Sequence, residues 1–431
     1  MADLQSRFDA KFLKDTAWNY AAFGIMAATG VILNFYIAAH FGIATLGVFN
    51  QIYAVYVIAA QVAVMGLHDS AQKHNAEFAA DPDLRVLVSA TALILAFAFG
   101  LTTAAAMVAL AGPIGRLADS PAVGDGIRLA APGLLFFALN KVLMGILNGR
   151  RQMKAFAGAQ GFRVVAILVV CLAVGAADLP GYMLGASFTI AEIALLPGLL
   201  IVVRPPLFGF ADGAGFRLWL GSHVRFGTKA LVNGFLAESY VRVDILMLGI
   251  FVSDAAVGIY SFAALFIEGL YQIPVVVRTI ANPVLVELLI ARDKPALGHF
   301  ARKTSLLSLA AFAVAAGAVI VIYPHLAPFF PAPLVADSRP LLLILAAGLF
   351  LYSAFIPLDQ ALLQGGLPGR QSLLMTFNVL ANVALNLALI PALGIVGAAL
   401  ATLLAYGISG LTVNLAAWRW LGIRGGLLIA R

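Results

Sequence analysis

Charged side chains stand inside long apolar runs of this sequence, where they are costly and therefore informative. A charge at the centre of a membrane-spanning helix costs about 2.5–3.5 kcal/mol on insertion scales, so such residues usually face a cavity or an oppositely charged partner. The second half of the chain holds seven of them, namely Lys229 near one end of a run and, deeper inside, Glu238, Arg242, Asp244, Glu268, Arg278 and Asp359. We interpret this half as a working part of a transporter.

The first half carries a smaller set of intramembrane charges, namely Lys141, Arg163 and Glu192. Lys141 and Arg163 have no acidic neighbour on their own predicted helices, and fixed cations near the middle of a membrane suit an anionic group, which Arg can hold with two hydrogen bonds. The alternative for Arg163 is an ion pair with Glu192 or with the other half of the chain. No catalytic residue and no metal ligand is predicted.

The two halves differ in the sign of their intramembrane charge, which is +1 in the first and −1 in the second, where Lys229 also counts. This difference predicts a substrate anion on the first half and a coupling cation, a proton or sodium ion, on the second, because buried carboxylates can carry protons. The predicted anion-binding residues are Lys141, Arg163, Arg242 and Arg278. The predicted ion-coupling residues are Glu192, Glu238, Asp244, Glu268 and Asp359.

Several of these side chains also have a structural interpretation. Arg242 follows Glu238 by four residues and shares its helix face, so the two can form an ion pair within one helix. Asp244 points away from Arg242 and needs another partner, and Arg278 can extend toward the cytoplasmic surface. A stripe of Asn378, Asn382 and Asn386 is more typical of hydrogen bonds between membrane helices than of sugar contacts.

The composition identifies the class of protein. Of 431 residues, 62% are hydrophobic and only 11% are charged, whereas soluble domains carry about 25% charged residues. This predicts an all-α polytopic membrane protein. The single cysteine, Cys171, excludes an intramolecular disulfide, and the six histidines show no metal-ligand spacing, so no cofactor is expected. The net charge of +7 resides in short connections, which indicates membrane orientation rather than nucleic-acid binding.

Apolar runs predict twelve membrane spans, each long enough to cross ~30 Å of hydrocarbon. They are residues 17–39, 46–67, 86–111, 128–148, 155–176, 182–203, 226–251, 256–282, 304–327, 340–364, 372–391 and 395–418. The connections on one side hold 19 Lys and Arg residues, and those on the other side hold only Arg116, Arg128 and Arg339. The positive-inside rule therefore places both termini in the cytoplasm.

These spans divide into two six-helix lobes, because short segments of the first half recur in the second. Residues 44–49 are echoed by 255–260, and residues 147–149 by 363–365, at offsets of 211 and 216. Six spans per repeat make the two repeats parallel, with a site expected between them. The predicted parts are an interfacial segment 1–15, a lobe 16–203, a cytoplasmic linker 204–225, a lobe 226–421 and a tail 422–431.

Several motifs carry a family resemblance that covers essentially the whole chain. VRVDILMLG at 241–249 with AVGIYS at 256–261, the Asn382–Asn386 region running into Gly394, and LGVFN at 46–50 resemble the polysaccharide-transporter family. This family belongs to the multidrug/oligosaccharidyl-lipid/polysaccharide (MOP) flippase superfamily. The resemblance implies a V-shaped, two-lobed exporter of the bacterial inner membrane that flips polyprenyl-pyrophosphate-linked oligosaccharides by alternating access, without covalent chemistry. Its implied partners are the lipid-linked substrate, a proton or sodium ion, membrane lipids, and glycan polymerase or ligase machinery.

Two other functions remain open at this point. A multidrug/cation antiporter of the same superfamily would be favoured by a cavity dominated by Glu268 and Asp359, and disfavoured by one that exposes Lys141 and Arg163. A membrane enzyme of glycan assembly would need larger extracytoplasmic loops than those near 112–127 and 328–339.

Overall fold

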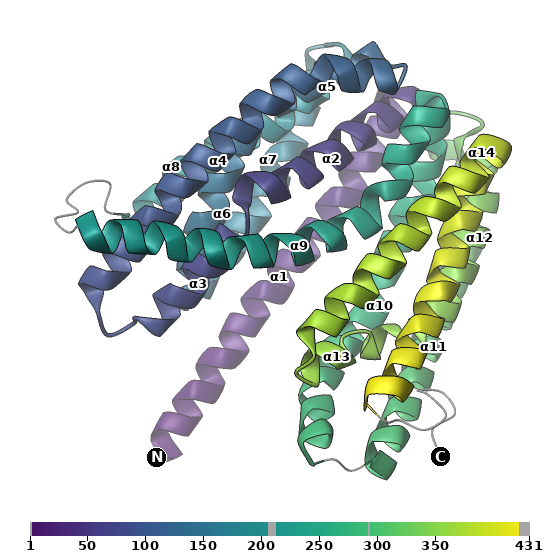
Figure 1. Ribbon diagram of the computed structural model, residues 1–431. Helices are drawn as coiled ribbons and strands as arrows, with labels where there is room; N and C mark the ends of the chain where they lie inside the picture. The colour runs from purple at the N-terminus through teal and green to yellow at the C-terminus, as the bar shows by residue number, and fades with distance from the viewer. Residues whose placement is uncertain (1, 206–212, 292–293, 422–431) are drawn as a thin grey trace. The chain divides into compact units, whose positions relative to one another are not determined.

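The chain folds into helices that group into two compact units. The computed structural model describes residues 2–205, 213–291 and 294–421, and all regular elements within them are α-helices or short 3-10 helices (Figure 1). The first unit comprises the chain up to residue 41 and residues 48–238, and the second comprises residues 42–47 and 239–431. The predicted all-α class is therefore confirmed.

The first unit begins with one long helix and continues through shorter ones. Its elements are α1 (Ala2–His40), most of α2 (Ile43–Val64), α3 (Leu67–Glu77), α4 (Pro82–Leu117), α5 (Pro121–Ala130), α6 (Gly133–Gly149), α7 (Met153–Ala176), the 3-10 helix η1 (Gly181–Gly185), α8 (Ala186–Val203) and the first part of α9 (Gly213–Phe251).

Helix α6 is the centre of this unit, because it packs against α3, α4, α7 and α8. Its side chains Leu143, Ile146 and Leu147 are completely buried. Close packing is possible because Gly145 and Gly149 face the backbone of α3, where an added Cβ atom would overlap the carbonyl oxygens of that helix. A residue carried by α6 is therefore held rigidly among four neighbouring helices.

The second unit has fewer, longer helices. After the remainder of α9 come α10 (Asp254–Ala291), α11 (Lys294–Ile322), the 3-10 helix η2 (Tyr323–Phe329), α12 (Leu334–Ser353), the 3-10 helix η3 (Ile356–Leu358), α13 (Ala361–Gln364) and α14 (Pro368–Leu421). Helix α10 packs against α11 and α12, and α12 packs against α14. A core that includes Leu285, Leu358 and Leu374 joins α10, η3 and α14.

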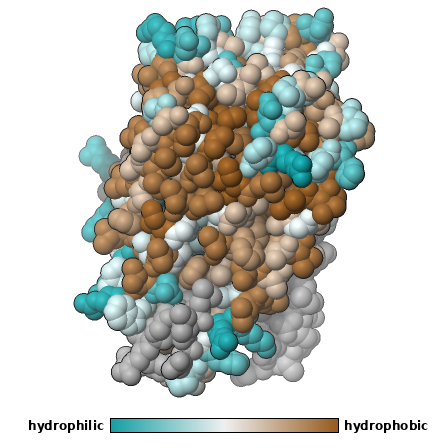
Figure 2. Space-filling view, turned by 90° about the vertical axis from the view of Figure 1, so that its right-hand side faces the viewer, coloured by the Kyte–Doolittle hydropathy of each residue, from teal (hydrophilic) through white to brown (hydrophobic). Residues whose placement is uncertain are grey.

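The helices expose apolar side chains widely. Val314 and Ile290 are each 77% exposed, and Figure 2 shows hydrophobic side chains over the middle of one face, with hydrophilic ones mainly near its two ends. In the part of the chain that the structure describes, nine helices are long and apolar enough to cross a membrane, or ten with the bent pair α5 and α6. The protein is therefore a multi-pass membrane protein.

The observed helices are consistent with the predicted twelve spans, but the exact layout of twelve spans stays a prediction. Helix α14 contains the two predicted spans 372–391 and 395–418, separated by Gly394, which has a φ of 58° that only glycine adopts readily. Helix α9 contains the span 226–251, although it is not among the nine.

Some helix limits differ from the predicted spans. The span 128–148 is bent by 45° between α5 and α6, where Pro132 lacks a backbone N–H and cannot continue the hydrogen bonding of a helix. Helix α12, which covers the start of the predicted span 340–364, already ends at Ser353, and Pro357 lies in the 3-10 helix η3 that follows. The predicted linker 204–225 falls partly outside the described residues, and the predicted tail 422–431 falls wholly outside them.

Candidate functional site: two intramembrane polar clusters

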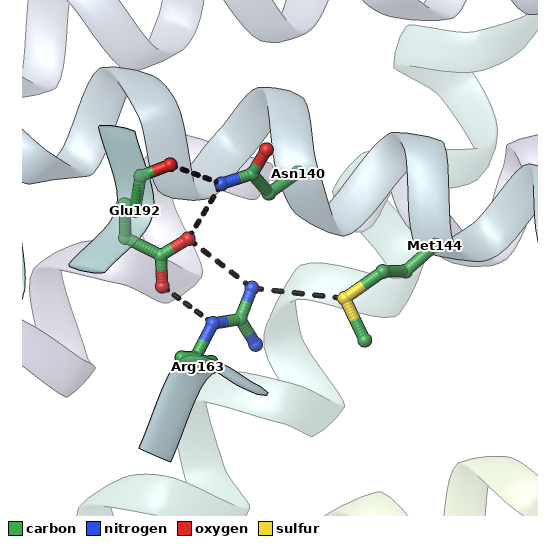
Figure 3. A network of polar contacts seen from close by, with 4 residues as sticks. All are labelled: Asn140, Met144, Arg163 and Glu192. Carbon is green, nitrogen blue, oxygen red and sulfur yellow. Dashed lines mark hydrogen bonds and ion pairs between the residues drawn. The ribbon is translucent and has the colours of Figure 1, made fainter. Parts of the chain in front are cut away.

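The first cluster is an ion pair between α7 and α8 that an amide of α6 supports. The Nε atom of Arg163 lies 2.5 Å from Oε1 of Glu192 (Figure 3). The Nη2 atom of the same guanidinium group donates to Oε2 of Glu192 over 3.3 Å. Asn140 donates to the same Oε2 and to the Glu192 backbone carbonyl, both over 2.8 Å. Because the side chain of Glu192 is only 2% exposed, its charge depends on these neighbours for stabilisation.

A second cation of the same unit lies beside this pair. The Nζ atom of Lys141 stands 5.7 Å from the centroid of the Phe137 ring, and the guanidinium of Arg163 stands 4.8 Å from the centroid of that ring. Lys141 takes part in none of the ion pairs that the structure shows among the described residues. Two cations thus lie against one aromatic ring, and the three charged side chains Lys141, Arg163 and Glu192 together carry a charge of +1.

The spacing along α6 explains why these groups meet. Phe137, Lys141 and Met144 follow one another at intervals of four and three residues, which places them on one face of the helix. Met144 on this face accepts a hydrogen bond from Arg163 through its sulfur over 3.7 Å. Since α6 packs against both α7 and α8, it brings the Lys141 cation to the pair that those two helices form.

The second unit holds two ion pairs between neighbouring elements. Arg242 of α9 donates to Oε1 of Glu268 on α10 over 3.2 Å. Arg278 of α10 donates to both carboxylate oxygens of Asp359, over 3.0 and 2.9 Å. These guanidinium groups therefore each have a carboxylate partner, and Arg278 binds one rather than only extending toward the surface.

Asp244 differs from the other buried carboxylates because the partners that the structure shows for it are neutral. Its Oδ2 accepts from Tyr260 over 3.0 Å and from Thr402 over 2.5 Å. Its Oδ1 accepts from Asn386 over 2.8 Å, and Asn386 also donates to Asn382. The predicted asparagine stripe thus joins α14 to α9, as expected for hydrogen bonds between membrane helices, and surrounds a carboxylate.

A cavity of about 220 Å³ adjoins this network, and every residue that lines it belongs to the second unit. Arg242, Asp244 and Glu268 reach it, together with the tyrosines 240, 260, 271 and 406. The spacing of Glu268, Tyr271 and Gln272 on α10 puts these three on one helix face toward the cavity.

The structure thus groups the predicted residues in a way that sequence distance does not reveal. Lys141, Arg163 and Glu192 come together in the first unit, and the alternative that pairs Arg163 with Glu192 is the arrangement found. Arg242 and Glu268 come together in the second unit, as do Arg278 and Asp359. Their roles in binding and coupling remain predictions.

Sequence reasoning missed Asn140, Tyr260 and Thr402, which complete these networks. Asn140 stands directly before Lys141 in the sequence. A polar residue in an apolar run was the available signal for each of the three, but such residues are too common in membrane helices to single out without their partners.

The fold is one that solved transporters of the MOP superfamily share. A structure of the lipid II flippase MurJ in an inward closed conformation matches 92% of this chain and 87% of its own, with a TM-score of 0.75 and 13% identity. An inward-facing multidrug resistance MATE family transporter of the MOP superfamily matches 92% of this chain and 94% of its own, with a TM-score of 0.72 and 16% identity.

A third structure, of a MOP superfamily transporter from Pyrococcus furiosus, has a TM-score of 0.64 at 15% identity and covers 95% of this chain and 96% of its own. At these identities the likeness establishes the fold alone. No curated protein sequence matches the chain.

The family follows from the sequence itself. The model of a family described as polysaccharide biosynthesis protein matches residues 44–321, and the chain belongs to this family. The family is thus one of polysaccharide biosynthesis, and the solved proteins that share its fold are membrane transporters and flippases.

Proposed function

We propose that this protein is a flippase of the bacterial inner membrane. It carries polyprenyl-pyrophosphate-linked oligosaccharide repeat units from the cytoplasmic to the periplasmic leaflet by alternating access of its two lobes, 16–203 and 226–421. Membership of a polysaccharide biosynthesis family and a fold like that of a lipid II flippase support this proposal. A glycan polymerase or ligase would then use the translocated product.

The observation that carries the proposal is the cationic cluster that Lys141 of α6 forms with the Arg163–Glu192 pair of α7 and α8. A lipid diphosphate must move its headgroup through a region where bare charge is expensive, so the protein must supply compensating cations. Arg163, Arg242 and Arg278 are each engaged with a carboxylate, and an anion would have to compete with that partner. Lys141 lies beside the Arg163 pair without such a carboxylate, and we assign it the first contact with the diphosphate.

We further propose that a cation, a proton or sodium ion, couples at Asp244. Glu192, Glu268 and Asp359 are each balanced by an arginine, whereas Asp244 has neutral hydroxyl and amide partners. Oxygen-rich surroundings of this kind suit either protonation or a small hard cation. Moving one charge through 100 mV is worth about 2.3 kcal/mol, enough to bias a movement between lobes.

A multidrug/cation antiporter is the second candidate, since the chain also has the fold of a MATE transporter. The cavity beside Glu268 favours it, because an aromatic cavity next to a carboxylate suits an organic cation. Against it stands Arg242, which donates to that same Glu268 and compensates its charge.

Binding of the two ligand classes distinguishes the candidates. Native mass spectrometry of the full-length protein should show undecaprenyl diphosphate bound in preference to tetraphenylphosphonium, a lipophilic cation. Lys141→Ala should weaken diphosphate binding about tenfold, because a hydrogen bond to a charged group is worth about 1.5–3 kcal/mol. Lys141→Arg should retain most of it.

Lys154→Ala is the matched control, since Lys154 is exposed and lies over the Trp18 ring, away from the cluster. Preferential binding of tetraphenylphosphonium, unaffected by Lys141→Ala, would replace the flippase by the antiporter.

A further inference from the structure

The cavity of the second unit has an aromatic lining that neither ion coupling nor diphosphate binding uses. Four tyrosines reach it, from α9 (Tyr240), α10 (Tyr260 and Tyr271) and α14 (Tyr406). Tyr260 is committed to Asp244, and Tyr240 shares a hydrogen bond with Ser409. Tyr406 has one ring face against Tyr352, with the two rings stacked at 5.6 Å.

Tyr271 is the tyrosine whose ring is left for a ligand. It is half-buried and makes none of the ring contacts that the structure shows among the described aromatic side chains. It lies three residues after Glu268 and one before Gln272 on the cavity face of α10. A ring in this position offers a flat apolar surface flanked by polar groups.

Each charged side chain that lines the cavity already has hydrogen-bond partners within the second unit. Glu268 accepts a hydrogen bond from Arg242, and Asp244 accepts three from neutral donors. An anion would have to displace Glu268 from Arg242, and a cation would have to draw Glu268 away from it. Breaking a partly buried pair leaves one charge exposed to a low dielectric, which is costly.

Uncharged hydrogen-bonding groups remain available at the same cavity. The amide of Gln272 lines it and offers both a donor and an acceptor, whereas Asn382, which also lines it, already accepts from Asn386. Paired donors and acceptors match the hydroxyl groups of a sugar, and an aromatic ring packs against the apolar face of its C–H groups.

We propose that this cavity binds one uncharged sugar ring, with Tyr271 as the stacking surface and Gln272 as the hydroxyl partner. That the ring belongs to a transported, lipid-linked oligosaccharide rests on the proposed function. The site as such discriminates against uronic acids and quaternary amines, because Arg242 and Glu268 compensate each other and the buried Asp244 carboxylate is enclosed by three hydrogen-bond donors.

The test uses the full-length protein in nanodiscs of phosphatidylethanolamine and phosphatidylglycerol, free of glycoside detergents and choline lipids. Saturation-transfer NMR measures binding of methyl glucoside, methyl galactoside and methyl N-acetylglucosaminide, with methyl glucuronide and tetraethylammonium as charged comparators. At least one neutral glycoside should bind, and Tyr271→Leu should weaken it about tenfold. Tyr271→Phe keeps the ring and should preserve binding.

Tyr20→Leu, at an exposed tyrosine of α1, is the matched control and should bind like the wild type. If Tyr271→Leu does not fold, Gln272→Leu provides the second variant, and it should weaken the same glycoside. Equal binding of the glucuronide, binding of tetraethylammonium alone, or neutral glycoside binding indifferent to both variants would overturn the sugar site. So would the absence of any glycoside binding to the wild-type protein.

Undecaprenyl diphosphate binding, measured on the same samples, separates this inference from the flippase proposal. Retained glycoside binding without diphosphate binding would contradict the flippase and leave the sugar site standing. Diphosphate binding without glycoside binding would contradict the sugar site and leave the flippase proposal standing.

Discussion

At the scale of single residues, the intramembrane charges are explained by the partners they find. Arg163, Arg242 and Arg278 meet Glu192, Glu268 and Asp359 respectively. Removing one member of a buried pair costs about 3–5 kcal/mol because the other charge is left uncompensated. Lys141 and Asp244 lack an opposite charge among these pairs, and we assign them the tasks of anion contact and ion coupling.

Asp244→Asn should abolish the dependence of transport on an ion gradient while leaving expression intact. The amide keeps the shape of the carboxylate and can still bond Tyr260 and Thr402, but it can neither exchange a proton nor neutralise a sodium ion. The measurement is the initial rate of substrate translocation in proteoliposomes with an imposed proton or sodium gradient. Asp178→Asn, at an exposed turn residue, is the control. A gradient response in Asp244→Asn equal to that of the wild type would remove Asp244 from coupling.

The charged residues could be predicted from the sequence, but their partners could not. A charge in an apolar run is visible because its transfer cost depends on residue type alone. Arg278 and Asp359, however, are 81 positions apart, and Arg163 and Glu192 are 29 apart. Which carboxylate meets which arginine depends on helix rotation and packing, which hydropathy does not encode.

At the scale of elements, α6 and its glycines determine the geometry of the first cluster. Gly145 lies against the backbone of α3 at His68, and Gly149 lies against it at Gln72. The sequence predicted a span here but neither its bend at Pro132 nor the short, polar helix α3, whose Asn75 is buried and bonded to Ser89. A short helix without an apolar run gives no hydropathy signal.

Gly145→Ala should destabilise the protein by about 1–3 kcal/mol, because its methyl group would overlap the His68 carbonyl oxygen and push α3 from α6. The same substitution at Gly158 of α7, which has open space around it, should be neutral or slightly stabilising, since alanine favours the helix. Thermal unfolding of both variants in one detergent measures the difference. Equal midpoints would contradict the close packing of α3 and α6.

At the scale of the whole molecule, the helices carry few charges and expose many large apolar side chains. A helix in lipid satisfies its backbone hydrogen bonds internally, so such helices suit a membrane. The sequence predicted this class because composition alone excludes a soluble fold. Orientation in the membrane is a separate property, predicted by 19 basic residues in one set of connections against 3 in the other.

Single cysteines in a Cys171→Ala background should report this orientation. Asp178→Cys and Ser253→Cys, both at exposed positions, should react in intact cells with a membrane-impermeant thiol reagent. Gly369→Cys, also exposed and with open space around it, should react only after the membrane is opened. The reverse pattern would place both termini outside the cytoplasm.

Translocation itself tests the central claim most directly. The purified protein is reconstituted into liposomes with a fluorescent undecaprenyl-diphosphate-linked oligosaccharide, and the fraction that becomes accessible to an impermeant quencher is followed with time. The account predicts rapid translocation by the wild type, about tenfold slower translocation by Lys141→Ala, and substantial recovery in Lys141→Arg, because the cation is restored. Translocation no faster than in protein-free liposomes, or equal rates in the wild type and Lys141→Ala, would contradict it.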